Sequence, residues 1–393
     1  MASAATAEAP QPLRCLAAVA HAAKAPLVIE EIIVAPPRAG EVRIRVVASA
    51  VCHTDLYTLG GEDSEAVWPV VLGHEAAGVV ESVGEGVTSV AVGDHVIPLY
   101  TAECRACRFC LSRKTNLCTR VRATQGKGLM PDGTTRLSLA ASGAPLHHYM
   151  GISSFAEFAV CAEVSLAVVN RAARLDRICL LGCGVTTGFG AVTRTARVEA
   201  GATAAVFGLG AVGLACLMGL QRSGAARIIA VDTNPAKEKL ARAFGATDFV
   251  NPKADVPAGV SLQQHIVNMT LVEGFGGVDF SFECVGSVAL MRSALECTVR
   301  GWGKSVIIGV APAGTELATR PFQLVTGRSW TGTAFGGVKG RTELPGLVEE
   351  YMSGTFRLDE FVTHEFKGVE SVIAAVDVMR DPSIGALRPV ISY

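Results

Sequence analysis

Four cysteines lie close together between residues 101 and 118, in the stretch TAECRACRFCLSRKTNLC. Cys104, Cys107, Cys110 and Cys118 follow the spacing C-x2-C-x2-C-x7-C. Four thiolates on one loop complete a tetrahedral zinc shell and leave no position for water, as in structural zinc sites. An iron–sulfur cluster or a set of free thiols would fit the same residues. The spacing predicts a structural metal loop at about 101–118, with zinc as the favoured ion.

A second metal site can be assembled from three distant residues: Cys52 in VCHTD, His74 in GHEAAG and Cys183 in LLGCGVTTG. Two thiolates and an imidazole leave the fourth zinc position open for substrate, as in catalytic zinc sites. Asp55 and Glu75 stand nearby in the sequence and offer carboxylates that could orient the imidazole or approach the metal. A lone Cys or His is also a common core residue, so spacing alone leaves both alternatives open.

A glycine-rich turn indicates a dinucleotide site. Gly208, Gly210 and Gly213 form G-x-G-x-x-G between the apolar stretch TAAVF and a predicted helix, where a backbone without side chains can approach a pyrophosphate. Asp232 closes the next predicted strand, RIIAVD, and its carboxylate would bind an adenosine ribose and repel a 2′-phosphate, which predicts NAD. Lys237, one turn further on, could reach the same ribose. The alternative is a turn required only for packing, with Asp232 as a helix cap.

The segments that must position these residues change in type near residue 184. Before it, alternating and β-branched stretches such as EVRIRVVASA (41–50) predict a mainly β domain. After it, the strand-like stretches TAAVF, ARIIAVD, TDFVN, GVDFSFECVG and KSVIIGV alternate with helical segments at 234–244 and 287–298. This alternation predicts a parallel sheet with helices on both faces. Gly245 fits a left-handed residue that ends the first of those helices.

The length of 393 residues exceeds what one hydrophobic core usually serves, so we expect two domains. The first covers residues 1–184 and carries the metal loop, and the dinucleotide-binding domain covers 185–334. Residues 335–393 are expected to return to the first domain.

Composition excludes several partners. The balance of 35 basic against 36 acidic residues gives no electrostatic reason to bind nucleic acid or a membrane surface. The uncharged stretch 200–221 is long enough for a membrane span, but its glycines favour a buried strand, turn and helix. The N-terminal stretch MASAATAEAPQPLRC lacks the pattern of a secretion or import signal, which predicts a cytoplasmic protein with reduced thiols.

A series of ordered motifs, from about Arg14 onward, resembles the zinc-dependent medium-chain alcohol dehydrogenases, most closely their class III, the S-(hydroxymethyl)glutathione dehydrogenases. The motifs are VCHTDLYTLGG, VLGHEAAGVVESVGEGV, the four-cysteine loop, TQGKGLMPDGT, GCGVTTGFGA, GLGAVGLA, TRPFQLVTGR and TAFGG. The resemblance implies an α/β protein, with a Rossmann doubly wound parallel sheet beside a GroES-like, mainly β catalytic domain. It also implies a homodimer that pairs through strands of the Rossmann domain.

By this resemblance each chain binds NAD and two zinc ions. Cys52, His74 and Cys183 hold the catalytic zinc, Glu75 stands beside it as a possible transient ligand, and the four-cysteine loop holds the structural zinc. A catalytic zinc ion acts as a Lewis acid that lowers the pKa of a coordinated hydroxyl, so that hydride leaves readily.

The resemblance assigns further roles near the catalytic zinc. Thr54 corresponds to the hydroxyl that takes the substrate proton and passes it toward the cofactor ribose, although it could instead be a turn hydroxyl bonded to its own backbone. His53 corresponds to a contact with the cofactor pyrophosphate. Tyr57 stands where many relatives carry a relay histidine, so the exit route of the proton stays open. Further cofactor contacts implied by the resemblance are Thr187, Val212, Phe335 and Arg388.

The expected substrate, S-(hydroxymethyl)glutathione, carries two carboxylates and one ammonium group, and arginine can bind a carboxylate in bidentate fashion. Arg122 matches the arginine that marks class III, and Asp63 and Glu65 match its acidic pair. Arg300 stands where the family usually has lysine, and Tyr100 is expected to line the inner pocket. The alternative is that the charged residues form an ordinary solvated surface.

The expected activity is therefore NAD-dependent oxidation of S-(hydroxymethyl)glutathione, together with NADH-dependent reduction of S-nitrosoglutathione. Two alternatives remain: an alcohol dehydrogenase for medium- and long-chain primary alcohols, and a non-catalytic NAD-binding scaffold with only the structural zinc. The sequence does not indicate which direction dominates, which cysteines are redox-modified, or what the alanine-rich N-terminal stretch does.

Overall fold

The structure is a computed structural model that describes residues 10–393, and it divides into two compact units. Unit 1 contains the chain up to Gly182 and returns with Lys339–Tyr393, and unit 2 contains Cys183–Val338. The domain boundaries expected from the sequence, 184/185 and 334/335, remain predictions.

Unit 1 contains a small closed barrel. Its strands are paired in the order β1 (Leu13–Ala20), β2 (Leu27–Val34), β7 (Leu137–Leu139), β8 (Pro145–His148) and β4 (Val70–Val71). Fully buried residues such as Val19, Ile32 and Phe155 form its core.

A seven-stranded sheet completes the β structure of unit 1. Its main path runs β10 (Leu166–Val169), β6 (His95–Pro98), β5 (Glu75–Val83), β3 (Glu41–Ala50), β18 (Arg388–Ser392) and β17 (Val362–Lys367), and β9 (Phe158–Ala162) also pairs with β3. β3 is the predicted strand EVRIRVVASA, and it is mostly buried because β5, β9 and β18 all pair with it. β17 and β18 come from the returning segment.

The helices of unit 1 are short, apart from two in the returning segment. They are α1 (His53–Leu59), α2 (Arg108–Leu111), α3 (Arg122–Gln125), α4 (Leu175–Ile178), α11 (Gly340–Met352) and α12 (Val372–Arg380), with 3-10 turns η1 (Glu163–Ser165), η2 (Cys179–Gly182), η6 (Asp359–Phe361) and η7 (Val369–Ser371).

Unit 2 is built on a six-stranded sheet in which every pairing is parallel. The order is β13 (Asp248–Val250), β12 (Arg227–Val231), β11 (Thr203–Phe207), β14 (Phe280–Glu283), β15 (Lys304–Ile307) and β16 (Ser329–Gly332). The first strand in sequence lies in the middle and the chain winds outward in both directions, which is the doubly wound Rossmann order. The five strands predicted after residue 184 are confirmed.

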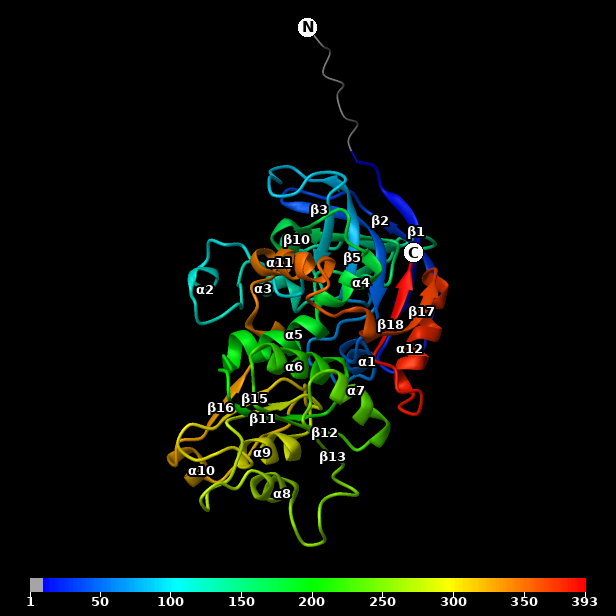
Figure 1. Ribbon diagram of the computed structural model, residues 1–393. Helices are drawn as coiled ribbons and strands as arrows, with labels where there is room; N and C mark the ends of the chain where they lie inside the picture. Colours follow the sequence, from blue (N-terminus) through cyan, green and yellow to red (C-terminus); the bar gives the residue numbers. More distant parts are fainter. Residues whose placement is uncertain (1–9) are drawn as a thin grey trace. The chain divides into compact units, whose positions relative to one another are not determined.

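Helices cover both faces of this sheet, as predicted. Figure 1 shows α5 (Gly184–Gly190) and α6 (Ala211–Arg222) on one face, with α8 (Leu262–Met269) and α9 (Val288–Glu296) on the other. The remaining helical segments are η3 (Ala191–Ala196), η4 (Pro235–Lys237), α7 (Glu238–Ala243), α10 (Pro321–Val325) and η5 (Phe335–Gly337). Gly245, just after α7, has a φ of 99°, which confirms the predicted left-handed end of that helix.

The uncharged stretch 200–221 forms β11, a turn and most of α6, so the predicted strand, turn and helix are confirmed. Within residues 10–393, no single helix is both long and apolar enough to cross a membrane. One bent pair of helical segments, Leu175–Gly182 with Gly184–Ala196, meets the criteria of length and composition together.

Candidate active site and metal centres

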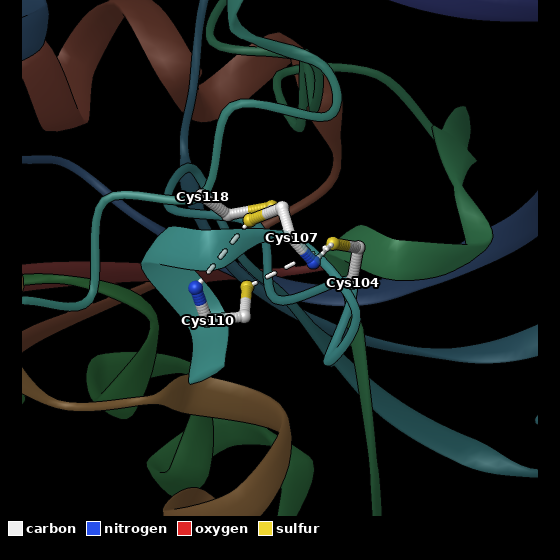
Figure 2. Close-up of side chains that lie close together, drawn as sticks. All are labelled: Cys104, Cys107, Cys110 and Cys118. Carbon is white, nitrogen blue, oxygen red and sulfur yellow. Dashed lines mark hydrogen bonds between the residues drawn. The ribbon is translucent and has the colours of Figure 1, made fainter. Parts of the chain in front are cut away.

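The four predicted loop cysteines converge around one point (Figure 2). The sulfurs of Cys104 and Cys110 lie 3.8 Å apart, those of Cys107 and Cys118 lie 4.0 Å apart, and all four lie within 4.8 Å of one another. A tetrahedron of sulfurs around one zinc ion, with Zn–S distances of about 2.3 Å, has edges of about 3.8 Å. A cluster of several iron atoms would hold its cysteines further apart. The geometry therefore fits a single zinc ion.

The local backbone prepares these sulfurs to bind a cation. The N–H of Cys107 donates to Cys104 Sγ at 3.3 Å, and the N–H of Cys110 donates to Cys107 Sγ at 3.4 Å, where the helix α2 begins. Burial alone would raise the pKa of Cys107, but backbone N–H groups of Thr119 and Cys110 donate to its sulfur and lower that pKa to about 6. N–H donors stabilise the thiolate, which is the form that binds metal.

The metal loop is fastened to the start of α11, also in unit 1. Lys339 Nζ donates to the carbonyls of Cys110 and Ser112, and Arg341 Nη1 donates to the carbonyl of Glu103 at 3.0 Å. The buried Glu103 carboxylate accepts hydrogen bonds from the backbone N–H and the hydroxyl of Thr342, at 2.9 and 2.6 Å. A loop with few apolar residues is thus held by its metal site and by three residues of the returning segment.

The second predicted metal site is also assembled. The ligand atoms of Cys52, His74, Glu75 and Cys183 lie within 4.8 Å of one another, and the first three of these residues are buried. Cys52 directly precedes α1, and Glu75 is the first residue of β5. Gly182 packs against β5, where a Cβ on it would lie 3.3 Å from Glu75 Cα, and this contact fixes the position of the residue that follows it, Cys183.

The orientation of His74 fits a metal ligand. Its Nδ1 donates to the buried carboxylate of Asp55 at 3.1 Å, and Asp55 also accepts the backbone N–H groups of Cys52 and Gly73, at 3.0 and 3.1 Å. The other ring nitrogen, Nε2, is buried and has no hydrogen-bond partner within residues 10–393. Buried nitrogen without a partner is costly unless an ion binds it. The two thiols and this nitrogen are a donor set that fits zinc. Asp55 supports the imidazole with its carboxylate, as the sequence predicted.

Arg388 contacts this centre directly. Its Nε and Nη2 donate to the two carboxylate oxygens of Glu75, at 2.9 and 3.0 Å, and Nη2 lies 3.5 Å from Cys52 Sγ. Burial raises the pKa of Glu75 to about 7, against the opposing charge of Arg388. The sequence predicted a cofactor phosphate as the partner of Arg388. That contact remains a prediction, because here the guanidinium is bound to Glu75.

The helix α1 carries the predicted proton-transfer residues. The hydroxyl of Thr54 lies 3.6 Å from Cys52 Sγ, and the carbonyl of Thr54 accepts the phenol of Tyr149 at 3.2 Å. His53 and Tyr57 lie on the same helix, and their roles remain predictions.

Two aromatic rings contact His74 edge-on. One belongs to Tyr100, predicted to line the pocket, with its centroid 6.1 Å away, and the other belongs to Tyr149, at 5.8 Å. Gln125 Nε2 holds this region by donating to the carbonyls of Tyr100 and Met150, at 2.8 and 2.7 Å. Sequence reasoning gave no role to Tyr149, which no local pattern distinguishes from a core residue, or to Gln125, although Gln125 lies in the motif TQGKGLMPDGT.

Three of the four charged residues predicted to bind substrate lie together in unit 1. Arg122 Nη2 forms an ion pair with Glu65 Oε1, and both side chains are about half exposed. The carboxylate of Asp63 accepts the backbone N–H of Glu65 at 2.9 Å and the hydroxyl of Thr58 at 2.9 Å. Arg300 is an exposed residue of unit 2.

The glycines of the dinucleotide motif differ in their surroundings. Gly208 has a φ of 89°, and a Cβ on Gly213 would lie 1.9 Å from the carbonyl oxygen of Gly208, so the fold itself requires these two glycines. A Cβ on Gly210, the residue before α6, would meet no described atom within 4 Å. Packing alone does not explain Gly210. The open space leaves room for a phosphate at the amino end of α6, and that contact remains a prediction.

Asp232 shapes this turn from the end of β12. Its carboxylate accepts the backbone N–H groups of Leu209 and Asn234, both at 2.8 Å, and an ion pair with Lys237 at 3.1 Å. The buried hydroxyl of Thr187 has no hydrogen-bond partner in the described part of the chain, which leaves it available to a ligand. Val212 lies in the first turn of α6, and Phe335 is fully buried. Their predicted contacts with the cofactor remain predictions.

The chain matches known families over most of its length. The family described as "Alcohol dehydrogenase GroES-like domain" matches residues 38–171, and the family described as "Zinc-binding dehydrogenase" matches residues 211–353. An S-(hydroxymethyl)glutathione dehydrogenase of Synechocystis sp. is 59% identical, over 97% of this chain and 100% of that protein. An alcohol dehydrogenase class-3 of Dictyostelium discoideum is 54% identical, over 97% of this chain and 98% of that protein.

Solved structures agree with this family. An alcohol dehydrogenase zinc-binding domain protein from Burkholderia ambifaria has a TM-score of 0.87 at 35% identity, covering 97% of this chain and 99% of that one. Benzyl alcohol dehydrogenase from Acinetobacter calcoaceticus has a TM-score of 0.85 at 28% identity with the same coverage. The chain therefore belongs to the zinc-dependent alcohol dehydrogenases, with a GroES-like domain, a Rossmann domain and two zinc sites, and within them to the class-3, S-(hydroxymethyl)glutathione dehydrogenase group.

Proposed function

We propose that this enzyme oxidises S-(hydroxymethyl)glutathione with NAD and reduces S-nitrosoglutathione with NADH at the same site. The observation that carries the proposal is the identity of 54 to 59%, over nearly the whole chain, to proteins named for this class and substrate. The cluster of Arg122, Glu65 and Asp63 supports it, because a substrate with carboxylates and an ammonium group needs both signs of charge.

The metal centre supplies one part of the chemistry. Cys52, His74 and Cys183 would hold a zinc ion, which would supply the Lewis acidity that lowers the pKa of the substrate hydroxyl. Asp55 holds the imidazole in the tautomer that leaves Nε2 free for the metal, and Arg388 balances the charge of Glu75.

Proton and cofactor handling fall to other residues. The hydroxyl of Thr54, beside Cys52 Sγ, takes the proton of the substrate hydroxyl and passes its own proton toward the cofactor ribose. Asp232 accepts hydrogen bonds from the adenosine ribose of NAD and repels the 2′-phosphate of NADP, which makes NAD the cofactor. Gly210 leaves space for the pyrophosphate.

The charged cluster binds the peptide part of the substrate. Arg122 binds a carboxylate, and Asp63 with Glu65 binds the ammonium group. Arg300 adds a second positive charge. An aliphatic alcohol makes none of these contacts, so the cluster favours the glutathione adduct over octanol.

The substitution Arg122→Ala tests this assignment. Loss of a charge-assisted hydrogen bond should raise KM for S-(hydroxymethyl)glutathione roughly 10- to 100-fold and leave KM for octanol nearly unchanged. Arg14→Ala is a matched control, because Arg14 is an exposed arginine paired with Glu31 in the same unit. Steady-state kinetics on both substrates measure the effect. Equal rises in KM for both substrates would contradict the glutathione assignment.

We also infer that the enzyme works in the cytoplasm as a homodimer, with the small glutathione adduct as its partner and with no role for nucleic acid or membrane. β16 supports the dimer, because it is the last strand of the sheet in unit 2 and no described strand pairs with its outer edge. Light scattering coupled to size-exclusion chromatography measures the mass directly, and a monomer would contradict this inference.

A further inference from the structure

A chain of hydrogen bonds runs through unit 1 from Tyr149, whose ring contacts the metal ligand His74, to the acidic pair Asp63 and Glu65. Thr58, on α1, is 1% exposed, and its hydroxyl donates to Asp63 Oδ2 at 2.9 Å. The phenol oxygen of Tyr149 lies 2.8 Å from the same hydroxyl. An ionised carboxylate can only accept, so Thr58 gives its single proton to Asp63. The phenol of Tyr149 also has one proton, and both the hydroxyl of Thr58 and the carbonyl of Thr54, 3.2 Å away, lie within its reach.

The two ends of this chain reach different parts of the site. At the inner end, the ring of Tyr149 lies edge-on to His74, with centroids 5.8 Å apart and planes at 73°. At the outer end, Asp63 Oδ1 accepts the backbone N–H of Glu65 at 2.9 Å. The predicted zinc ligand His74 and the acidic pair Asp63 and Glu65 are therefore joined by a continuous series of contacts.

The chemistry of a simple alcohol does not require this arrangement. A buried hydroxyl costs free energy unless it is paired, and valine would fill the same space as Thr58 without that cost. What the hydroxyl adds over valine is a hydrogen bond that fixes the position of Asp63. In a glutathione adduct the ammonium group is a fixed number of bonds from the reacting carbon, whereas octanol has no such group.

We propose that Thr58 and Tyr149 are positioning residues that hold Asp63 and Glu65 at a set distance from the metal centre, and so make the enzyme selective for substrates with an ammonium group at the matching distance. The inference rests on the proposed function and adds to it the residues that set its specificity. Neither residue needs to touch the substrate ammonium itself.

The substitution Thr58→Val removes the hydroxyl and keeps the shape of the side chain. KM for S-(hydroxymethyl)glutathione should rise roughly five- to tenfold, the range expected for one lost hydrogen bond, with kcat and the KM for octanol unchanged. Thr58→Ser restores the hydroxyl and should restore KM. If Thr58 only stabilised the fold, Thr58→Val would change KM for both substrates by the same factor. That result would contradict the positioning role.

A second measurement isolates the ammonium group. S-Methylglutathione and its N-acetyl derivative, used as competitive inhibitors, differ in that charge. In the wild type, N-acetylation should raise Ki several-fold, and in Thr58→Val that penalty should shrink toward none. An equal penalty in both proteins overturns the positioning role, even if KM has changed.

Tyr149→Phe covers the case in which Thr58→Val does not fold. It keeps the ring beside His74 and removes the phenol oxygen that contacts Thr58 and the carbonyl of Thr54. The ratio of KM for the adduct to KM for octanol should therefore rise, but less than in Thr58→Val. An unchanged ratio of the two KM values in Tyr149→Phe overturns the proposal.

If the wild type itself prefers octanol, the proposed function fails. If the wild type prefers the adduct and both variants keep that preference, only the positioning role is wrong.

Discussion

Gly210 gives a test of the dinucleotide site at the scale of one residue. A methyl group there meets no described atom, so Gly210→Ala should fold like the wild type. If a pyrophosphate approaches this backbone, the methyl group will obstruct it, and Kd for NAD should rise by roughly tenfold or more. Gly346→Ala in α11 is the control, since Gly346 also has open space and should leave Kd unchanged. Isothermal titration calorimetry with NAD measures both variants, and an unaltered Kd in Gly210→Ala would refute the assignment.

Asp232 gives a second test at this scale. Asp232→Asn keeps the size of the side chain and removes the charge that repels a 2′-phosphate. The ratio of kcat/KM for NADP to that for NAD should rise by roughly tenfold. Asp248→Asn, on the neighbouring strand β13 and paired with Arg227, should leave the ratio alone. Steady-state kinetics with NAD and with NADP measure this ratio. If the ratio in Asp232→Asn equals that of the wild type, Asp232 does not set the cofactor preference.

Local spacing predicted some residues of the site and not others. The four-cysteine loop could be predicted because its ligands lie within one short segment. The links from Thr58 to Tyr149 and from Glu75 to Arg388 join positions 91 and 313 residues apart, and no periodicity in a single sequence records such pairs. The catalytic zinc ligands were indicated by their residue types, and only family motifs separated them from ordinary core residues.

At the scale of elements, the metal loop should depend on its ion. α2 has four residues, too few to be stable alone, and the loop is held by four sulfurs and the contacts of Lys339. Cys107→Ser should lose one of two zinc ions per chain and lower the midpoint of thermal unfolding by several degrees or more. Ser112→Ala, in the same loop, should keep both ions. Elemental analysis and calorimetry measure these effects, and two ions retained in Cys107→Ser would contradict the site.

The elements of the two units differ in how well sequence predicted them. The strands of unit 2 are nearly continuous apolar stretches separated by helices, so their type and parallel arrangement could be predicted. The barrel of unit 1 includes β4, with two residues, and β7, with three. Segments this short show no clear alternation, and their pairing depends on contacts from distant parts of the chain.

At the scale of the whole molecule, His148 should make stability depend on pH. It is buried in β8, and its Nε2 accepts the backbone N–H of Arg136 at 3.1 Å, which requires a neutral ring. Burial, aided by the charge of Arg136, lowers the pKa of His148 to about 3, from an ordinary value of 6.5. As the pH falls, His148 is therefore protonated near pH 6.5 in the unfolded chain but only near pH 3 in the folded chain.

This difference has a definite sign. Between pH 6.5 and 3, each unit of falling pH should remove about 1.4 kcal/mol from the free energy of unfolding, and above pH 6.5 the residue should contribute nothing. Urea unfolding at pH 7.5 and 5.5 measures this effect on the transition that includes unit 1. Between these two pH values, the free energy of unfolding should fall by about 1 kcal/mol more in the wild type than in His148→Gln. Equal losses in the two proteins would show that His148 does not carry this dependence.

The pairing of Arg388 with Glu75 has a consequence for the order in which the enzyme matures. These residues are 313 positions apart, so on the ribosome the segments bearing Cys52 and His74 emerge long before the guanidinium that neutralises their neighbour. The four-cysteine loop spans fifteen consecutive residues and can capture its ion as soon as it leaves the exit tunnel. The four-cysteine loop is therefore complete early in synthesis, whereas the full surroundings of the second metal site are complete only when Arg388 has been made.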